Sequence, residues 1–257
     1  MTRHETFDTP IAQKELVLAT DLDGTFLGGT EEDRRKLYAF IEANRARVGL
    51  IFVTGRDPGF ISELVRKHGV PRPDYVVGDV GTTIASMGSD NHLRPIEALE
   101  AEIADAWGQA NARVQAALHH SAGLKLQSTG FRYRVSYDLD PVHFDPRAHD
   151  IIADLGLDTL VSDGQYLDVL PKGVSKGPSL LRLLSHLDIK NDRVLVAGDT
   201  LNDLSMLTLG LPAVAVGGAE PALIDALAGH DHVHIAGGIG VAGIAEAIVK
   251  KQMFTAA

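Results

Sequence analysis

The sequence predicts an α/β protein with a doubly wound, mostly parallel sheet as its core and an inserted α+β cap. Short apolar runs alternate with segments of helical periodicity in the first and last parts of the chain, as in a Rossmann-like core. Between these parts, one stretch has the strict alternation of an antiparallel strand. We expect residues 1–83 and 163–257 to form the core and residues 84–162 to form the cap.

The first part of the chain predicts a strand–helix–strand–helix unit. Residues 16–20 form an apolar run followed by DLDGT, and a helix then begins after the N-cap candidate Thr30. A second run at 48–53 ends in TGR, an amphipathic helix follows at 57–68, and a third run at 75–77 ends in GDVGTTI. Ligands bind at the carboxyl ends of the strands in such sheets, so we expect the chemistry to follow these runs.

The middle of the chain departs from this rhythm. A long helical segment runs from about Ala98 to Leu118, and we expect Trp107 in the cap core. The sequence FRYRVSYDL at 131–139 alternates like an antiparallel strand with one solvated face. We expect the parallel rhythm to resume with YLDVLP at 166–171, a helix at 177–187, a run at 194–198, a helix from Asn202 and a run at 213–216.

Composition limits the classes of partner. The net charge of -10 and the isoelectric point near 5.5 disfavour nucleic acid and anionic membranes, because such partners reward clustered Lys and Arg. The chain has no cysteine, no apolar run of about 18 residues and no apolar signal segment in residues 1–15. We therefore expect a cytoplasmic protein with a small-molecule partner. Composition does not indicate an oligomeric state.

Four polar motifs follow the predicted strands or begin a predicted helix. They are DLDGT at 21–25, TGR at 54–56, Lys176 in VSKG and GDTLND at 198–203. In this order they resemble the four motifs of the haloacid dehalogenase superfamily of phosphatases, in the class with an α/β cap. The resemblance implies hydrolysis of a phosphate ester through an aspartyl-phosphate on Asp21, with Mg²⁺ as the cofactor.

Elementary chemistry assigns roles to the same residues. Asp21 and Asp199 supply hard oxygen ligands for Mg²⁺, which offsets the repulsion between a phosphate dianion and the nucleophile Asp21. Asp23 can protonate the leaving alcohol and later deprotonate water, and the family assigns its backbone carbonyl to the metal. Thr54 and Lys176 can donate hydrogen bonds to phosphoryl oxygens.

Further residues complete the predicted site. We expect substrate contacts from Gly55, Arg56 and Asn202. Asp203 is a predicted metal residue, and with Asn202 it would orient metal-bound water and the lysine. Lys172 is an alternative to Lys176, since both lie in PKGVSKG. We favour Lys176, because it directly precedes Gly177 at a helix start and matches the position of the lysine in the family.

Two other motifs suggest functions that we disfavour. HDHVH at 230–234 has three histidines at a spacing of two, but alternating histidines on a short strand are usually solvated, and no carboxylate triad surrounds them. GGIGVAG at 237–243 resembles a glycine-rich dinucleotide loop, but it lacks the flanking βαβ unit. We expect it to form a terminal loop and a helix start.

Within the superfamily, three segments resemble the sucrose-phosphatase branch and related disaccharide-phosphate phosphatases. They are ATDLDGTFLGG, FRYRVSYDLDP and YLDVLPKGVSKG. The resemblance implies a phosphorylated sugar or glycoside as substrate, with the cap recognising sugar hydroxyls. Gln127, Arg132 and Arg134 lie in or beside the cap strand and can bridge hydroxyls, and a solvated strand face is the alternative.

Two rival functions remain at this stage. A phosphotransferase, such as a phosphosugar mutase, uses the same intermediate but returns the phosphoryl group to a sugar. A catalytically silent binding or regulatory protein is the other. The intact set of Asp21, Asp23, Lys176 and Asp199 argues against the silent protein.

Overall fold

The computed structural model describes residues 9–67, 69–128, 130 and 132–255. Its large sheet has eight strands: β1 (Leu16–Thr20), β2 (Val48–Val53), β3 (Tyr75–Gly78), β4 (Thr83–Met87), β5 (Leu93–Pro95), β10 (Val194–Gly198), β11 (Ala213–Gly217) and β12 (Val233–Ile239). They are ordered β12-β11-β10-β1-β2-β3-β4-β5, and all neighbours from β12 to β3 are parallel. The predicted fold class is therefore confirmed.

The middle strands of this sheet are buried on both faces. In β1, Val17 and Ala19 belong to one hydrophobic cluster, whereas Leu16 and Leu18 belong to another. Successive side chains of a strand point to opposite faces, so the continuous apolar run LVLAT reflects cover on both sides.

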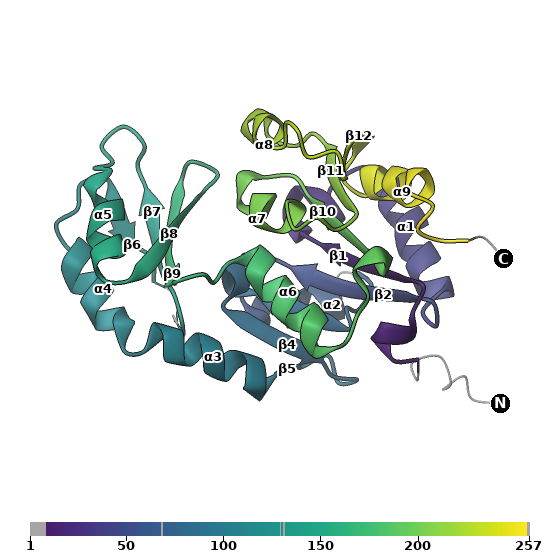
Figure 1. Ribbon diagram of the computed structural model, residues 1–257, viewed down its shortest axis with the longest axis horizontal. Coiled ribbons are helices and arrows are strands. Elements are labelled where there is room, and N and C mark those ends of the chain that lie inside the picture. Colours follow the sequence, from purple (N-terminus) through teal and green to yellow (C-terminus); the bar gives the residue numbers. More distant parts are fainter. Residues whose placement is uncertain (1–8, 68, 129, 131, 256–257) are drawn as a thin grey trace.

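Helices provide that cover (Figure 1). Their bounds are α1 (Glu31–Ala43), α2 (Pro58–Lys67), α3 (Glu97–Trp107), α6 (Lys176–His186), α7 (Leu204–Leu207), α8 (Pro221–Ala226) and α9 (Val241–Lys250). Residues of α3, α6, α7 and α8 join the cluster of Val17, whereas residues of α1, α2 and α9 join the cluster of Leu16. Thr30 caps α1 as expected, because its side chain accepts a hydrogen bond from the N–H of Asp33.

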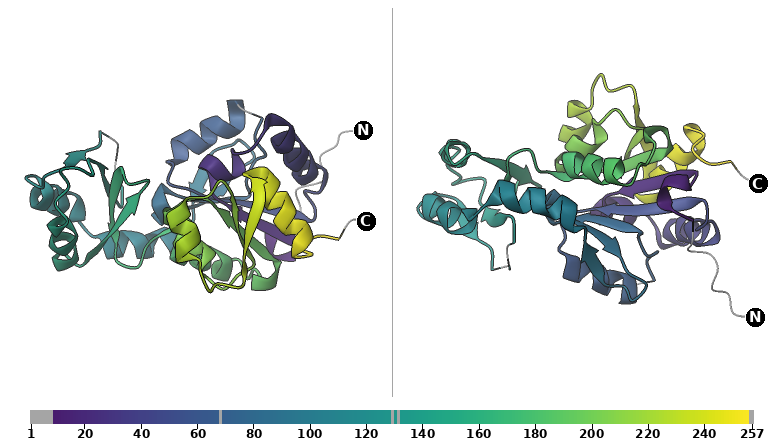
Figure 2. Two further views of the ribbon diagram at one scale, coloured as in Figure 1. Left: turned by 90° about the horizontal axis from the view of Figure 1, so that it is seen from above. Right: turned by 60° about the horizontal axis from the view of Figure 1, so that its bottom comes forward.

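A smaller antiparallel sheet forms the cap, which stands to one side of the large sheet in all three views (Figures 1 and 2). Its strands are β6 (Leu124–Leu126), β7 (Val135–Leu139), β8 (Leu157–Ser162) and β9 (Tyr166–Pro171), in the order β6-β7-β9-β8. A third hydrophobic cluster joins this sheet to α4 (Ala110–Leu118) and α5 (Arg147–Asp154). Trp107 is buried in that cluster, as predicted.

The chain enters the cap through α3 and returns from β9 to α6 through residues 172–175 (Figure 1). The prediction that β9 resumes the parallel core was wrong, because β9 pairs antiparallel with β7 and β8. A central strand covered on both faces has the same continuous apolar signature in either sheet. β4 and β5 join the large sheet, so the sheets change near Ile96 and Pro171 rather than at 84 and 162.

Two local predictions were also wrong. The helical segment between Ala98 and Leu118 is two helices, because the chain turns at Gly108, whose φ is 57°. The solvated face predicted for the strand in 131–139 is also missing from β7, where only Asp138 is exposed. Ser136, on the same face, is buried and bonded to the carboxylate of Asp168. His68 and Phe131, at the ends of two predicted elements, lie outside the described residues.

None of the described helices is both long and apolar enough to cross a membrane.

Candidate active site

The residues that follow three neighbouring parallel strands meet at one edge of the large sheet. Asp21 follows β1, Thr54 follows β2 and Asp199 follows β10. The N–H of Asp21 donates to the carbonyl of Ala197 at 2.9 Å, and the N–H of Thr54 donates to that of Val77 at 2.8 Å. These bonds continue the parallel pairing past the strand ends, so three of the predicted motifs come together.

Lys176, at the start of α6, connects these motifs. Its Nζ donates to Oδ1 of Asp21 at 2.7 Å, of Asn202 at 2.7 Å and of Asp203 at 2.6 Å. The lysine is 1% exposed, whereas Lys172 is exposed on the connection from the cap. The structure therefore brings Lys176 to the nucleophile candidate.

Three carboxylates gather around this lysine. One oxygen each of Asp21, Asp199 and Asp203 can lie within 4.8 Å of the others, which is a group that could hold a metal ion. Asp203 uses both of its oxygens within the protein: Oδ1 accepts from Lys176, and Oδ2 accepts from the N–H groups of Asp199 and Thr200. Asp21 and Asp199 each engage only Oδ1 among the described residues, so their Oδ2 atoms are the better candidates for ligands.

The cluster carries more negative than positive charge. Burial raises the pKa of Asp21 to about 8, Lys176 opposes this rise, and Asp203 and Asp199 add to it. Burial likewise raises the pKa of Asp199 to about 6. The hydrogen bond from Thr25 lowers this pKa, and the charge of Asp203 raises it further. One ammonium faces three carboxylates, and a cation between the free oxygens would relieve that imbalance.

Asp23 lies nearer the solvent. Its carboxylate pairs with Arg56, with Nε to Oδ2 at 2.8 Å and Nη2 to Oδ1 at 3.1 Å, and the two side chains are 54% and 49% exposed. The guanidinium also lies over the ring of Phe60, with Cζ 4.6 Å from its centroid. Thr54 is buried, and its hydroxyl accepts from the N–H of Arg56 at 3.2 Å.

Gly24 has a conformation and a position that require glycine. Its φ is +79°, and a Cβ there would lie 2.0 Å from Oδ2 of Asp199. The DLDGT motif therefore needs this residue type so that Asp199 can reach the other carboxylates.

A pocket of about 660 Å³ lies between this cluster and the cap. On the core side it includes all the predicted residues except Asp203, namely Asp21, Asp23, Thr54, Gly55, Arg56, Lys176, Asp199 and Asn202. On the cap side it includes Gln127, Arg134, Ser162, Asp163, Tyr166 and Asp168. A small polar ligand could therefore contact both parts of the chain.

The three cap residues predicted from sequence have different positions. Gln127 lines the pocket while its Nε2 donates to Oδ1 of Asp138 at 2.9 Å. Arg134 lines it too, but its guanidinium is held by Asp79, Asp168 and Ser136. Arg132 is not part of the lining and pairs with Glu100.

Sequence reasoning missed the hairpin between β8 and β9, which brings Ser162, Asp163 and Tyr166 to the pocket. The dipeptide Asp163–Gly164 between two β-type runs is a hairpin signal and could have revealed it.

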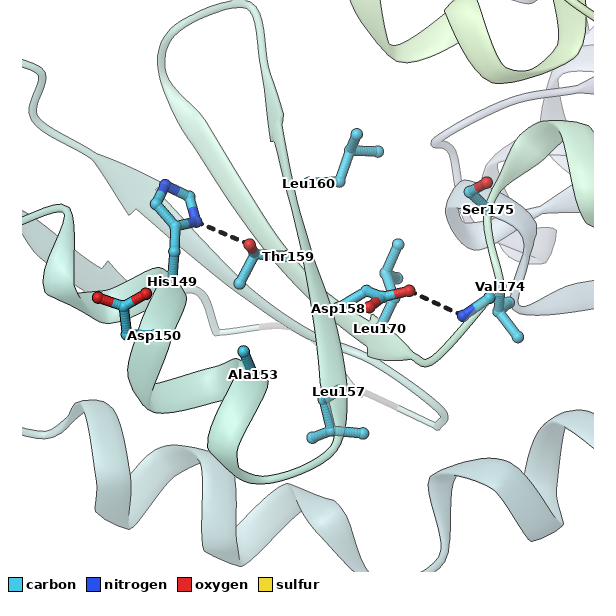
Figure 3. Close-up of a pocket in the computed structure, with 11 residues that line it drawn as sticks. His149, Asp150, Ala153, Leu157, Asp158, Thr159, Leu160, Leu170, Val174 and Ser175 are labelled. Atoms are coloured by element: carbon cyan, nitrogen blue, oxygen red, sulfur yellow. Dashed lines mark hydrogen bonds between the residues drawn. The ribbon is translucent and has the colours of Figure 1, made fainter.

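A second cavity, of about 450 Å³, lies at the edge strand β8, and Figure 3 shows its lining. Nδ1 of His149 lies 2.7 Å from Oγ1 of Thr159, and Asp158 accepts from the N–H of Gly173 at 2.7 Å. None of the clustered carboxylates reaches this cavity, so it is separate from the candidate active site.

The histidines are less solvated than predicted, since all three are partly buried, whereas the glycine motif lies where it was expected. His232 contacts the carbonyl of Leu207 and His234 contacts Glu246, and within the described part of the chain the only group suited to a metal is the aspartate cluster. Gly240, with a φ of 56°, precedes α9, as expected for a loop and helix start. A Cβ on Gly240 would lie 2.3 Å from the carbonyl carbon of Gly28, so the loop packs directly on the segment after DLDGT.

The amino-acid sequence is similar to those of several known enzymes. The chain is 42% identical over 235 residues to the glucosylglycerol-phosphate synthase of Pseudomonas anguilliseptica. The aligned region covers 91% of this chain but only 30% of that relative. It is 29% identical over 218 residues to the mannosylfructose-phosphate phosphatase of Agrobacterium fabrum (strain C58), covering 81% of the chain and 85% of the relative. Sucrose-phosphatase 1 of Nicotiana tabacum is 28% identical, and the match spans 48% of its length.

The fold is also similar to those of solved structures. The sucrose-phosphatase of Synechocystis sp. PCC6803, solved with sucrose and phosphate, superposes with a TM-score of 0.83 at 25% identity, over 93% of this chain and 98% of that one. A haloacid dehalogenase-like hydrolase from Bacillus subtilis shares the fold, with a TM-score of 0.67 at 16% identity. The family model of sucrose-6F-phosphate phosphohydrolase matches residues 14–250. The chain therefore belongs to the sucrose-6F-phosphate phosphohydrolase family, within the haloacid dehalogenase superfamily.

Proposed function

We propose that this protein hydrolyses the phosphate ester of a glycoside phosphate through an aspartyl-phosphate on Asp21. The observation that carries the proposal is the hydrogen bond from the buried Lys176 to Asp21 at the floor of a pocket whose other wall is the cap. The lysine orients the Asp21 carboxylate so that Oδ1, which accepts its hydrogen bond, would attack phosphorus while Oδ2 stays available as a metal ligand. Its ammonium, together with the Thr54 hydroxyl, then faces charge that develops on the phosphoryl oxygens.

Asp23 serves as the acid and base of the two steps. It gives its proton to the leaving alcohol when the aspartyl-phosphate forms, and it takes a proton from the water that hydrolyses this intermediate. Its carboxylate lies against Arg56 at the pocket, with Nε of the guanidinium 2.8 Å from Oδ2.

The donor set fits Mg²⁺, a hard cation that prefers oxygen ligands. Oδ2 of Asp21, Oδ2 of Asp199 and the carbonyl of Asp23 would hold it, and Asp203 would orient Lys176 and the loop of Asp199. Bound there, Mg²⁺ would neutralise the phosphate dianion as it approaches the Asp21 carboxylate.

The cap and the relatives support a sugar-containing phosphate ester as the substrate. The pocket of about 660 Å³ presents hydroxyl, carboxylate and amide groups of the cap, which suit sugar hydroxyls. The relative with 42% identity is named for glucosylglycerol phosphate, and those with 28–29% identity are named for sucrose and mannosylfructose phosphates. We therefore rank glucosylglycerol phosphate first, before the phosphorylated disaccharides.

The test is release of inorganic phosphate from these glycoside phosphates, from glucose 6-phosphate and from p-nitrophenyl phosphate. We expect kcat/KM to be highest for a glycoside phosphate, and we expect excess chelator to abolish turnover of all of them. Transfer of the phosphoryl group to added sugar without phosphate release would indicate a phosphotransferase instead. No turnover of any ester with Mg²⁺ would overturn the proposal.

Metal affinity should depend on pH. The raised pKa values of Asp21 and Asp199, about 8 and about 6, mean that these carboxyls bind protons over this range in the metal-free protein. A cation must displace those protons, so its affinity should fall as the pH falls, by up to about tenfold per pH unit for each proton displaced. Calorimetric titration of Mg²⁺ into the free protein between about pH 6 and pH 8 measures this. An affinity that does not change over this range would contradict the assigned ligands.

Asp23→Asn should separate the two chemical steps. With a glycoside phosphate, whose alcohol is a poor leaving group, we expect a loss of about 10²–10⁴-fold in kcat. With p-nitrophenyl phosphate the first step needs no acid, so rapid mixing should show a burst of nitrophenol followed by slow turnover. Equal losses on both substrates without a burst would argue against the double role.

A further inference from the structure

The turn after β3 connects the cap to the catalytic loops. This turn is η3 (Asp79–Gly81), and two consecutive residues that are not glycine, Asp79 and Val80, have φ values of 49° and 59°. A left-handed conformation is unusual for a β-branched residue and persists only where the surroundings enforce it. Contacts from the rest of the protein must therefore stabilise this turn.

The turn contacts two parts of the catalytic machinery. The N–H of Val80 donates to the carbonyl of Thr54, and the N–H of Asp79 donates to that of Arg56, both at 3.1 Å. On its other side, a Cβ on Gly81 would lie 2.4 Å from the carbonyl carbon of Ser175 and 2.9 Å from the N of Lys176. The turn is therefore packed between the TGR motif and the lysine that orients the nucleophile.

The cap holds the same turn through one side chain. Nη2 of Arg134 lies 3.2 Å from Oδ1 of Asp79, while its Nη1 donates to Asp168 and Ser136 of the cap sheet at 3.0 Å each. Arg134 and Asp79 are both 14% exposed, so the ion pair is largely shielded from water. The other oxygen of Asp79 accepts from the Thr83 hydroxyl at 2.8 Å, which fixes the carboxylate toward the cap.

We infer that Arg134 and Asp79 are positioning residues that couple the seating of the cap to the alignment of the catalytic loops. Arg134 belongs to the cap and Asp79 to the core, and their contact stabilises the left-handed turn against Thr54, Arg56 and Lys176. Neither residue touches the reacting atoms. This assignment rests on the proposed function, and it gives Arg134 a role other than the sugar contact expected from sequence.

The test compares Asp79→Asn and Arg134→Gln with a matched control at the other end of β3. Asp74 precedes that strand and pairs with the buried Lys14 at 3.2 Å, and neither residue lines the pocket. We expect Asp79→Asn and Arg134→Gln each to lower kcat on the best glycoside phosphate by about tenfold or more, with KM within about threefold. The double variant should be no worse than the poorer single variant, and kcat on p-nitrophenyl phosphate, which uses the same catalytic loops, should fall by a similar factor. Asp74→Asn should lower Tm and leave both kcat values unchanged.

Different results would overturn the inference in recognisable ways. An increase in KM for Arg134→Gln, with no effect of Asp79→Asn, would make the arginine a sugar contact. Multiplicative losses in the double variant, or losses that follow Tm in all three variants including Asp74→Asn, would make the pair merely structural.

A second measurement does not depend on the proposed activity. Amide hydrogen exchange of residues 54–56 and 79–81 should become faster in Asp79→Asn and Arg134→Gln but not in Asp74→Asn. Unchanged exchange in all three variants would refute the coupling even if the protein hydrolyses glycoside phosphates. Faster exchange in a protein without phosphatase activity would refute the proposed function and leave the structural coupling intact.

Discussion

Asp21→Asn is expected to lower kcat/KM on every phosphate ester by at least about 10⁴-fold, because an amide cannot form the acyl phosphate. The side chain keeps its shape and can still accept the hydrogen bond from Lys176, so the fold should survive. Steady-state phosphate release measures the loss. Asp225→Asn, an exposed carboxylate on α8, is the control and should keep full activity. Substantial residual turnover in Asp21→Asn would require direct attack by water.

The same variant should change the pH dependence of stability in the metal-free protein. Burial raises the pKa of Asp21 to about 8, well above its value in an unfolded chain of about 4. Between these pH values the native state binds more protons than the unfolded state, so the native state loses stability as the pH rises through this window. Asn cannot ionise and avoids that loss. The Tm of Asp21→Asn relative to wild type should therefore increase from about pH 5 to about pH 8, and a constant difference would contradict the charge imbalance of the cluster.

Lys176→Met should have the second largest effect and should act on both activity and stability. Burial alone would lower the pKa of Lys176, but the adjacent Asp203 and Asp21 raise it overall, so the lysine stays charged. Its removal leaves two buried carboxylates without their cation, which typically costs about 3–5 kcal/mol in the free energy of unfolding. We expect kcat to fall by at least about 10³-fold as the nucleophile loses its orientation and the phosphoryl group its donor. Urea titration and phosphate release measure the two effects.

Two further variants make this prediction specific. Lys172→Met removes the neighbouring exposed lysine and should change neither quantity. Lys176→Met combined with Asp203→Asn removes one of the uncompensated charges, so it should recover part of the stability without recovering activity. If Lys172→Met caused the larger loss of activity, our choice between the two lysines would be wrong.

The sequence predicted the part of the fold in which local pattern and tertiary environment agree. Runs such as LVLAT at 16–20 are buried on both faces, and the residues that end such runs meet because parallel strands end at one edge. The same logic failed for β9, where YLDVLP is buried on both faces in an antiparallel sheet. The hydrophobic pattern shows that a strand is buried on both faces, but not whether it runs parallel or antiparallel to its neighbours. Only the identity of the strands it pairs with distinguishes these two cases.

The cap side of the pocket was less predictable for a related reason. Arg132 and Arg134 look alike in FRYRVSYDL, yet one pairs with Glu100 and the other with Asp79 and Asp168. These partners are 32, 55 and 34 residues away, and nothing in the local pattern specifies them. Catalytic residues at strand ends are positioned by the sheet, whereas cap residues are positioned by contacts between distant segments.

The close packing of Gly240 on Gly28 has a consequence for the synthesis of the chain. The loop after the nucleophile motif is made early, but its packing partner lies at the start of α9, more than two hundred residues later. Until the ribosome has released that segment, Gly28 and Gly29 lack one of the surfaces on which they pack. A nascent chain that already contains all the predicted site residues should therefore complete the packing of this loop only when α9 emerges.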